Sequence, residues 1–159
     1  MIFTGYAEIT IDAKQRLAIP AKFRGLLDPA RDGNAWYCIP WPGQGLMLFT
    51  EPMFNQFANR GEGTLTPGED EGEFETSLYG LTERLEMDSA GRITLPKLHT
   101  DLTKLGSEVV VVGSRYRLEV RDKATWTAGI SGRFERLALQ ARKIKMGPAS
   151  EVGGATTTR

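Results

Sequence analysis

The chain carries the stretch Asp12-Ala13-Lys14-Gln15-Arg16-Leu17-Ala18-Ile19-Pro20, and a second copy of it reads Asp88-Ser89-Ala90-Gly91-Arg92-Ile93-Thr94-Leu95-Pro96. In each copy an Arg follows the Asp by four residues, and a Pro follows the Arg by four. The residues between Arg and Pro are apolar at their first and third positions. A repeat of this kind predicts two similar structural units in one chain.

Each copy predicts a β-hairpin, because apolar and small or polar residues alternate on both sides of the loop. Gly91 stands where a three-residue loop needs a left-handed residue, and Gly adopts that conformation at little cost. The first copy has Gln15 at this position, which predicts mild strain or a different turn. Asp12 and Asp88 are expected to orient the turns by accepting hydrogen bonds from backbone N–H groups of the loop.

Two interpretations remain open for Arg16 and Arg92. Each can form an ion pair with the Asp four residues before it and hold the turn. Each can also face outward as a planar fork that suits a phosphate or a guanine edge. Spacing favours neither role, and the two are compatible when the Asp orients the fork.

Short helices are expected over residues 20–27 and 96–103, with Pro20 and Pro96 at the first helical position. Lys22 and Arg24 lie on the first of these helices. A solvated helix face is the preferred interpretation for both side chains, and phosphate contact is the alternative.

The order of the remaining patterns gives each half as β-β-α-β-β-α. We predict a first unit over residues 1–60, an acidic linker with a short helix over 61–82, a second unit over 83–146 and a disordered tail over 147–159. The last helix is expected to be weakened by its two central glycines. Core positions are predicted for the three tryptophans, Trp36, Trp41 and Trp126.

Charge is unevenly distributed although the net charge is zero. Residues 61–88 hold one basic and nine acidic side chains, whereas residues 89–159 hold thirteen basic and six acidic ones. The second half could therefore meet a polyanion, and the acidic middle would repel one. Basic residues of the last helix are expected on a face that is solvated or packs against a neighbouring subunit: Arg133, Arg136, Arg142, Lys143 and Lys145.

Several classes of protein fit the sequence poorly. No apolar run approaches the ~20 residues of a membrane span. We expect no secretory signal, since the N-terminal residues enter a strand pattern almost at once. The single Cys38 fits a reducing cytoplasm. Cys38 and the single His99 lie in different halves, and the sequence has no cluster of His, Cys and Asp with metal-binding spacing. It also has no phosphate-binding loop motif. We therefore predict no metal, no cofactor and no catalytic residues, and an enzyme is the least favoured class.

The two Asp-x-x-x-Arg motifs, the apolar-x-apolar-Pro after each, and the later residues Val112-Gly113, Tyr116, Glu119 and Trp126 resemble the MraZ family. These are bacterial proteins built from two tandem AbrB/SpoVT-type swapped-hairpin units. The resemblance covers residues 1–146. It implies an α+β fold in which the two units form a pseudo-two-fold β-barrel with flanking helices.

The resemblance also implies a function. Members of this family are transcriptional regulators of the division and cell-wall gene cluster. They form ring-shaped homo-oligomers that bind repeated sites in double-stranded promoter DNA through the Arg-bearing loops. Here Lys14 and Arg16 would form the first DNA-contacting pair and Arg92 the second, with Ala90 in the place of Lys14. A cytoplasmic, nucleoid-associated protein is implied, without a membrane partner or a small-molecule substrate.

One departure from the family concerns the stretch between the last helix of the first unit and the second Asp-x-x-x-Arg motif, which is usually rich in Arg in this family. This chain carries acidic residues there, so weaker DNA binding per chain is expected, and a ring that offers many copies would compensate. The alternative is an oligomeric scaffold or interaction protein with weakened DNA binding. A one-unit antitoxin or sporulation regulator of the AbrB type is disfavoured by the tandem repeat.

Overall fold

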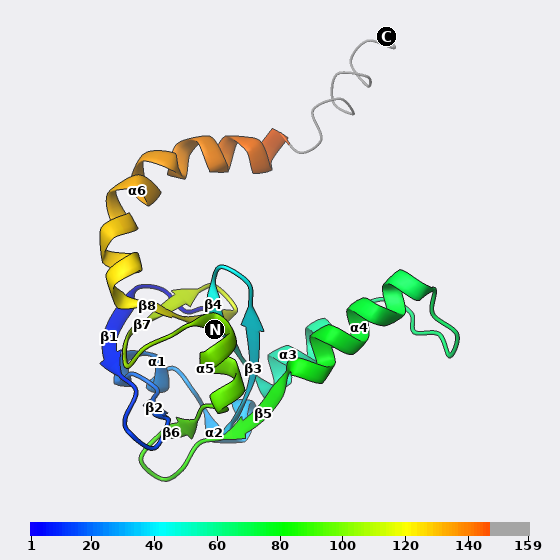
Figure 1. Cartoon of the computed structure of the whole chain (residues 1–159), viewed down its shortest axis with the longest axis horizontal. Coiled ribbons are helices and arrows are strands. Elements are labelled where there is room, and N and C mark those ends of the chain that lie inside the picture. Colours follow the sequence, from blue (N-terminus) through cyan, green and yellow to red (C-terminus); the bar gives the residue numbers. More distant parts are fainter. Residues whose placement is uncertain (147–159) are drawn as a thin grey trace. The chain divides into compact units, whose positions relative to one another are not determined.

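The computed structural model of the protein describes residues 1–146, and the tail expected over 147–159 lies outside the described residues. Within the described residues, Met1–Ala124 forms one compact unit and the residues from Thr125 to Met146 belong to a second. The elements in chain order (Figure 1) are β1 (Tyr6–Thr10), β2 (Arg16–Ala18), α1 (Ala21–Arg24), α2 (Pro29–Asp32), β3 (Ala35–Trp41), β4 (Gly45–Thr50), α3 (Glu51–Ala58), α4 (Glu69–Leu81), β5 (Glu83–Glu86), β6 (Arg92–Thr94), α5 (Lys97–Thr103), β7 (Glu108–Ser114), β8 (Arg117–Asp122) and α6 (Lys123–Met146).

The fold is α+β with antiparallel strands. Within residues 1–146, one sheet has six strands in the order β1-β7-β8-β4-β3-β5, and a second sheet consists of β2 and β6. The expected closed β-barrel is wrong, because the larger sheet is open and ends at β1 and β5. The larger sheet stays open because β2 and β6 are short. Each has three residues and pairs only with the other, so neither bridges the two edge strands of the described sheet.

The expected hairpins are also wrong as strand pairs. Each loop is closed by two backbone bonds. One runs from Asp12 N–H to the Arg16 carbonyl at 3.0 Å and from Asp88 N–H to the Arg92 carbonyl at 2.9 Å. The other runs from Gln15 N–H to the Asp12 carbonyl at 3.0 Å and from Gly91 N–H to the Asp88 carbonyl at 2.9 Å. Beyond these bonds the strands diverge. The strand before the first loop, β1, pairs with β7, and the strand before the second loop, β5, pairs with β3.

The two halves of the chain pair in the same pattern. Thr10, two residues before the first loop's Asp, lies opposite the first residue of β7. Glu86, two residues before the second loop's Asp, lies opposite the first residue of β3. Between them β4 pairs with β8, with Leu46 opposite Val120 and Leu48 opposite Leu118. Each half therefore supplies the outer strand beside the other half's third strand.

One hydrophobic core joins both halves, and it is built from side chains of β2, β3, β4, β6, β7 and β8 together with Phe3 and Phe23. Trp36 is only 1% exposed, as expected for a core residue. Trp41 lies at the end of the same strand and is 36% exposed, so its predicted core position is wrong. It is the last residue of β3 and pairs with Gly45, directly before the turn that leads into β4. Trp126 is partly buried, with the Arg133 guanidinium 4.6 Å from its ring centroid.

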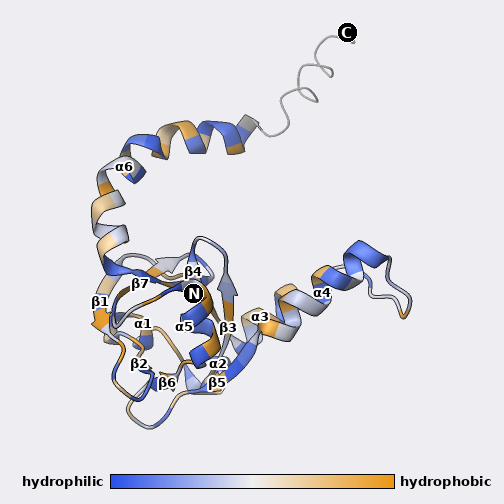
Figure 2. Ribbon diagram, in the orientation of Figure 1, coloured by the Kyte–Doolittle hydropathy of each residue, from blue (hydrophilic) through white to orange (hydrophobic). Residues whose placement is uncertain are grey.

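A linker with a short helix was expected over residues 61–82, and the structure has a helix of 13 residues there, from Glu69 to Leu81. Three acidic residues occupy the first turn of α4, where the positive end of the helix dipole favours them. Figure 2 shows that α4 is hydrophilic at its start and more apolar toward its end. There Tyr79 meets Phe54 of α3 edge to face, with ring centroids 6.2 Å apart. The apolar end holds the helix against the sheet, and the acidic end faces solvent.

The last helix, α6, runs without interruption from Lys123 to Met146. Gly129 and Gly132 therefore do not break it, although each costs about 1 kcal/mol relative to Ala. The good helix formers that follow sustain the remaining turns. Its apolar side chains stay exposed within the described chain, including Phe134 at 77% and Ile144 at 79%. None of the helices within residues 1–146 is both long enough and apolar enough to cross a membrane.

Candidate nucleic-acid interface

The loop between β1 and β2 is organised by Asp12. Its Oδ1 accepts hydrogen bonds from the backbone N–H groups of Lys14, at 2.9 Å, and Arg16, at 2.8 Å. Its Oδ2 accepts from Arg16 Nε at 2.7 Å. These bonds, the one from the Arg16 backbone first among them, hold the pKa of Asp12 below its ordinary value. The carboxylate thus stays charged and fixes both the turn and the guanidinium.

The loop between β5 and β6 repeats this geometry. Asp88 Oδ1 accepts from the backbone N–H groups of Ala90 and Arg92, both at 2.9 Å, and Oδ2 accepts from Arg92 Nε at 2.8 Å. The pKa of Asp88 is lowered for the same reason, chiefly by the bond from the Arg92 backbone. Arg16 and Arg92 therefore each form the ion pair with the Asp of their own loop. This pairing is compatible with the second interpretation, in which the same guanidinium also contacts a phosphate or a guanine.

The left-handed position is filled differently in the two loops. Gly91 has a φ of 76° and Gln15 a φ of 66°, so the turn is the same and Gln15 bears a strain of about 1–2 kcal/mol. The Gln15 amide donates to Thr100 Oγ1 at 3.0 Å, which ties the first loop to α5.

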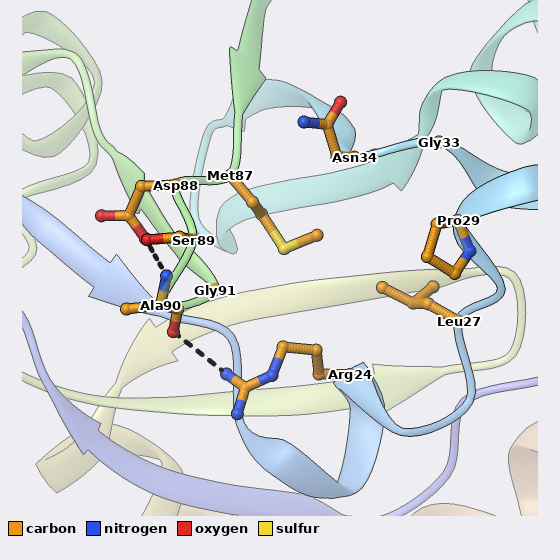
Figure 3. Close-up of a pocket in the computed structure, with 10 residues that line it drawn as sticks. All are labelled: Arg24, Leu27, Pro29, Gly33, Asn34, Met87, Asp88, Ser89, Ala90 and Gly91. Atoms are coloured by element: carbon orange, nitrogen blue, oxygen red, sulfur yellow. Dashed lines mark hydrogen bonds between the residues drawn. The ribbon is translucent and has the colours of Figure 1, made fainter.

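Arg24 occupies the corresponding place at the second loop. Its Nη1 donates to the carbonyl oxygens of Ile19, at 2.9 Å, and Ala90, at 3.5 Å (Figure 3). A Cβ on Gly91 would lie 2.4 Å from that nitrogen, so the missing side chain makes room for the brace. This bracing role of Arg24 was missed by the sequence analysis. The only signal was the exchange of Gly for Gln between the two copies.

Lys22, the other basic residue expected on this helix, lies beside β1 and the Phe23 ring. Its Nζ is 3.5 Å from the Tyr6 carbonyl oxygen and 5.5 Å from the centroid of the Phe23 ring. The structure therefore does not bring Lys22 and Arg24 together at one loop.

Pairing of β2 with β6 places the two loops at the two ends of one short ribbon. Arg16 lies opposite Thr94, and Arg92 lies opposite Ala18. Residues opposite one another and residues two apart share one face of a ribbon, so both Arg side chains emerge on the same face. Because Arg16 and Arg92 are diagonal neighbours, their Cα atoms lie about 7–8 Å apart. The other face carries Leu17 and Ile93, which are fully buried.

The exposed face of this ribbon can donate hydrogen bonds to a ligand. The Arg16 and Arg92 side chains are 30% and 37% exposed. Among residues 1–146, each guanidinium uses only Nε in a hydrogen bond, so its terminal N–H groups remain available. Lys14 is exposed at the tip of the first loop. The ribbon therefore presents three cations on a surface whose back is anchored in the core.

A surface pocket of about 500 Å³ lies beside the second loop. Figure 3 shows Met87 and Leu27 at its apolar side, and the loop backbone at the other. Arg24 lines it as well. An anionic group that settled against the second loop would thus meet the Arg24 guanidinium as well as the loop.

Cys38 and His99 are brought together although they lie in different halves. Sγ and Nδ1 are 3.3 Å apart, and His99 Nε2 is 2.6 Å from the Leu81 carbonyl oxygen. A carbonyl only accepts, so Nε2 carries the proton and Nδ1 accepts from the thiol. Burial, with a smaller contribution from Glu83, raises the pKa of the Cys38 thiol far above its ordinary value. A protonated, buried thiol is no nucleophile, and the pair instead ties β3, α5 and the end of α4 together.

Acidification is expected to destabilise the protein through His99. Burial, opposed by the Leu81 bond and by Glu83, holds the pKa of His99 below its ordinary value. The unfolded chain therefore binds this proton more readily, and the stability from the neutral imidazole is complete above the ordinary His pKa and lost as the pH falls. Urea unfolding at pH 7 and pH 5 should show a larger loss for the wild type than for His99→Gln. Equal losses would contradict the assignment.

Comparison with known proteins gives a consistent set of relatives. A family model described as "MraZ protein, putative antitoxin-like" matches residues 78–145. A protein of Coxiella burnetii (strain RSA 493 / Nine Mile phase I), named Transcriptional regulator MraZ, is 30% identical over 125 residues, covering 79% of this chain and 82% of its own. Proteins of the same name from Chromobacterium violaceum and Thiobacillus denitrificans are 34% and 28% identical, covering 77% and 82% of this chain and 82% and 87% of theirs.

Proposed function

The chain belongs to the MraZ family, and on that premise we propose that it is a sequence-specific DNA-binding transcriptional regulator. Its targets would be promoter repeats of the bacterial division and cell-wall gene cluster. It would act in the cytoplasm, at the nucleoid, and without catalysing a reaction. The relatives are named transcriptional regulators, which supports the general role.

The observation that carries the proposal is the common face of Arg16 and Arg92 on the β2–β6 ribbon. The major groove of B-DNA admits a two-stranded ribbon, and an Arg fork can bond both acceptors of a guanine. The ion pairs with Asp12 and Asp88 orient the forks before DNA arrives. Lys14 would add a contact at the loop tip.

Lys22 and Arg24 would contribute phosphate contacts beside the ribbon. Arg24 is the stronger candidate of the two, since its guanidinium already lies against the second loop. Phosphate contacts fix the register of a protein on DNA, whereas base contacts specify the sequence. These two residues would therefore add affinity and salt dependence more than specificity.

We further propose that residues 1–60 and 83–146 are two tandem AbrB/SpoVT-like swapped-hairpin units, with residues 61–82 between them. The matched loops and the exchanged outer strands support this division. A pseudo-two-fold relation would explain why β4 pairs with β8 and β2 with β6, each with its counterpart.

Assembly into a ring would compensate for the acidic α4. One chain offers few cations to DNA, while its acidic segment repels phosphates. Several ribbons on one ring bind repeated sites with an affinity that no single ribbon reaches. The exposed apolar residues of α6 supply surface for contact between subunits, with Phe134, Leu137 and Ile144 at steps of three and seven residues on one side of the helix.

Glutamate at Phe134 and Ile144 together is expected to disrupt the assembly. Analytical ultracentrifugation should show the mass falling from that of an oligomer toward the 17.6 kDa of one chain. Lys143→Glu, on the opposite side of α6, is the matched control and should leave the mass unchanged. A wild type that sediments as a monomer at micromolar concentration would refute the ring, and an oligomer unaffected by the double substitution would refute this contact.

The test of DNA binding is a fluorescence anisotropy titration with duplex DNA from upstream of the protein's own gene, repeated at several salt concentrations. A specific complex with a negative slope of log affinity against log salt is the expected result. The alternative function, an oligomeric scaffold with weakened DNA binding, is favoured by the acidic residues of α4. It predicts a stable oligomer that gives no specific complex.

A further inference from the structure

A second cationic site lies away from the ribbon, in a surface pocket of about 540 Å³. The pocket is bounded by the end of α3, by β4 and by the turn between β7 and β8. It is lined by three arginines and three aromatic residues: Arg60, Arg115, Arg117, Phe49, Phe57 and Tyr116. Sequence patterns alone predict no specific role for these arginines.

Two of the three guanidinium groups are held by aromatic rings and not by carboxylates. Arg60 lies 4.3 Å from the centroid of the Phe57 ring, and Arg115 lies 4.5 Å from that of Tyr116. Among residues 1–146, no ion pair involves Arg60 or Arg115. Stacking keeps both planar groups in place while their N–H edges stay available for an anion.

The third guanidinium forms an ion pair with Glu119, the one carboxylate that contacts these arginines among residues 1–146. Arg117 Nη2 is 2.7 Å from Glu119, whose side chain is buried. Glu119 also binds Arg121 Nη2 at 2.8 Å, so a single negative charge is shared between two arginines. Together with Arg60 and Arg115, the cluster therefore carries an excess of positive charge.

Arg115 is also held in a costly backbone conformation. Its φ is 69°, in a two-residue loop between the paired residues Ser114 and Arg117. Such loops normally place Gly, Asn or Asp at left-handed positions, and the turn between β3 and β4 has Gly43 with a φ of 76°. Backbone bonds to Phe3 in both directions, at 2.8 and 3.1 Å, hold Arg115 there. Strain kept in this way is a sign of functional use.

We propose that this pocket binds a phosphate-bearing ligand through Arg60, Arg115 and Arg117. Guanidinium forks match the oxygens of a phosphate in pairs, and two of these forks carry no competing carboxylate. Phe49, Phe57 and Tyr116 give the pocket an apolar side that suits the body of such a ligand. The phosphate belongs either to a free nucleotide-like molecule or to the DNA backbone. The site adds to the proposed function, since none of its residues lies in the ribbon loops.

The test is the double variant Arg60→Gln, Arg115→Asn. Asn tolerates the left-handed conformation, so the turn is retained and its strain reduced while two charges are removed. Isothermal titration with inorganic pyrophosphate should show at least tenfold weaker binding for the double variant than for the wild type. Lys97→Gln, which removes an exposed cation elsewhere in the same unit, should bind pyrophosphate as the wild type does. Thermal unfolding should show that the double variant is folded.

A DNA titration separates the two sources of phosphate. If the backbone of DNA supplies it, the double variant should lower the salt slope by about 0.9 for each phosphate that is no longer neutralised. If a small molecule supplies it, DNA binding should be unchanged while pyrophosphate binding is abolished. The proposal is overturned if the double variant matches the wild type in both titrations. That result would leave the ribbon's role in DNA binding intact, because Arg16 and Arg92 are untouched.

Discussion

Alanine at both Arg16 and Arg92 is expected to weaken specific DNA binding by roughly 30-fold to 10⁴-fold, from about 1–3 kcal/mol for each bidentate contact with a guanine. The two side chains share the exposed face of the β2–β6 ribbon, so one substitution leaves a partial site and two remove it. In an assembly with many ribbons the loss is multiplied, since every ribbon is altered at once.

Anisotropy titrations at several salt concentrations would measure this effect, with Lys97→Ala as the control. Lys97 forms an exposed ion pair with Asp101 on α5 and lies outside both loops. The double variant should stay folded, because partly exposed ion pairs such as those with Asp12 and Asp88 contribute only about 0–1 kcal/mol. DNA affinity that survives the loss of both Arg side chains would show that the ribbon is not the reading surface.

Trp36→Ala is expected to cost about 3–5 kcal/mol of folding free energy, the usual range for a buried Trp. The ring is 1% exposed and lies against Phe3, with centroids 6.1 Å apart. Phe3 in turn meets Phe23 of α1 edge to face at 5.9 Å. The resulting cavity would loosen the N-terminal residues and α1 together. The loss is a large part of the roughly 5–15 kcal/mol that a typical domain possesses.

The same strand offers the control. Trp41 ends β3 and is 36% exposed, so Trp41→Ala removes much less buried surface and should cost only about 1 kcal/mol. Urea unfolding of both variants, followed by circular dichroism, gives the two free energies under one condition. Similar losses for the two tryptophans would mean that the packing around Trp36 is not as described.

The loops are the part of the site that could be predicted best. Their geometry depends on hydrogen bonds between residues at most four apart, such as those that the backbone N–H groups of Lys14 and Arg16 donate to Asp12. The left-handed residue is equally local, and Gly91 indicated its position directly. The turn between β7 and β8 is not indicated in this way, because its left-handed residue is Arg115 and not Gly, Asn or Asp.

Contacts across long separations could not be predicted. The contact of Cys38 with His99 joins residues that sequence patterns treat as unrelated. The brace from Arg24 to the second loop, and the convergence of Arg60 with the turn at Arg115, are of the same kind. A helix or strand pattern shows which side of an element is apolar, but not which other element will cover it.

By itself the sequence determined the two Asp-to-Arg loops, the order of strands and helices and the alternation of apolar residues, because each depends on neighbours along the chain. The tertiary structure alone decided the partners: β1 with β7, β5 with β3, and β2 with β6. The apolar faces of the strands from both halves are buried in one core, and each half places its outer strand beside a strand of the other half. That exchange, and not either loop alone, brings the Arg16 and Arg92 side chains onto one face.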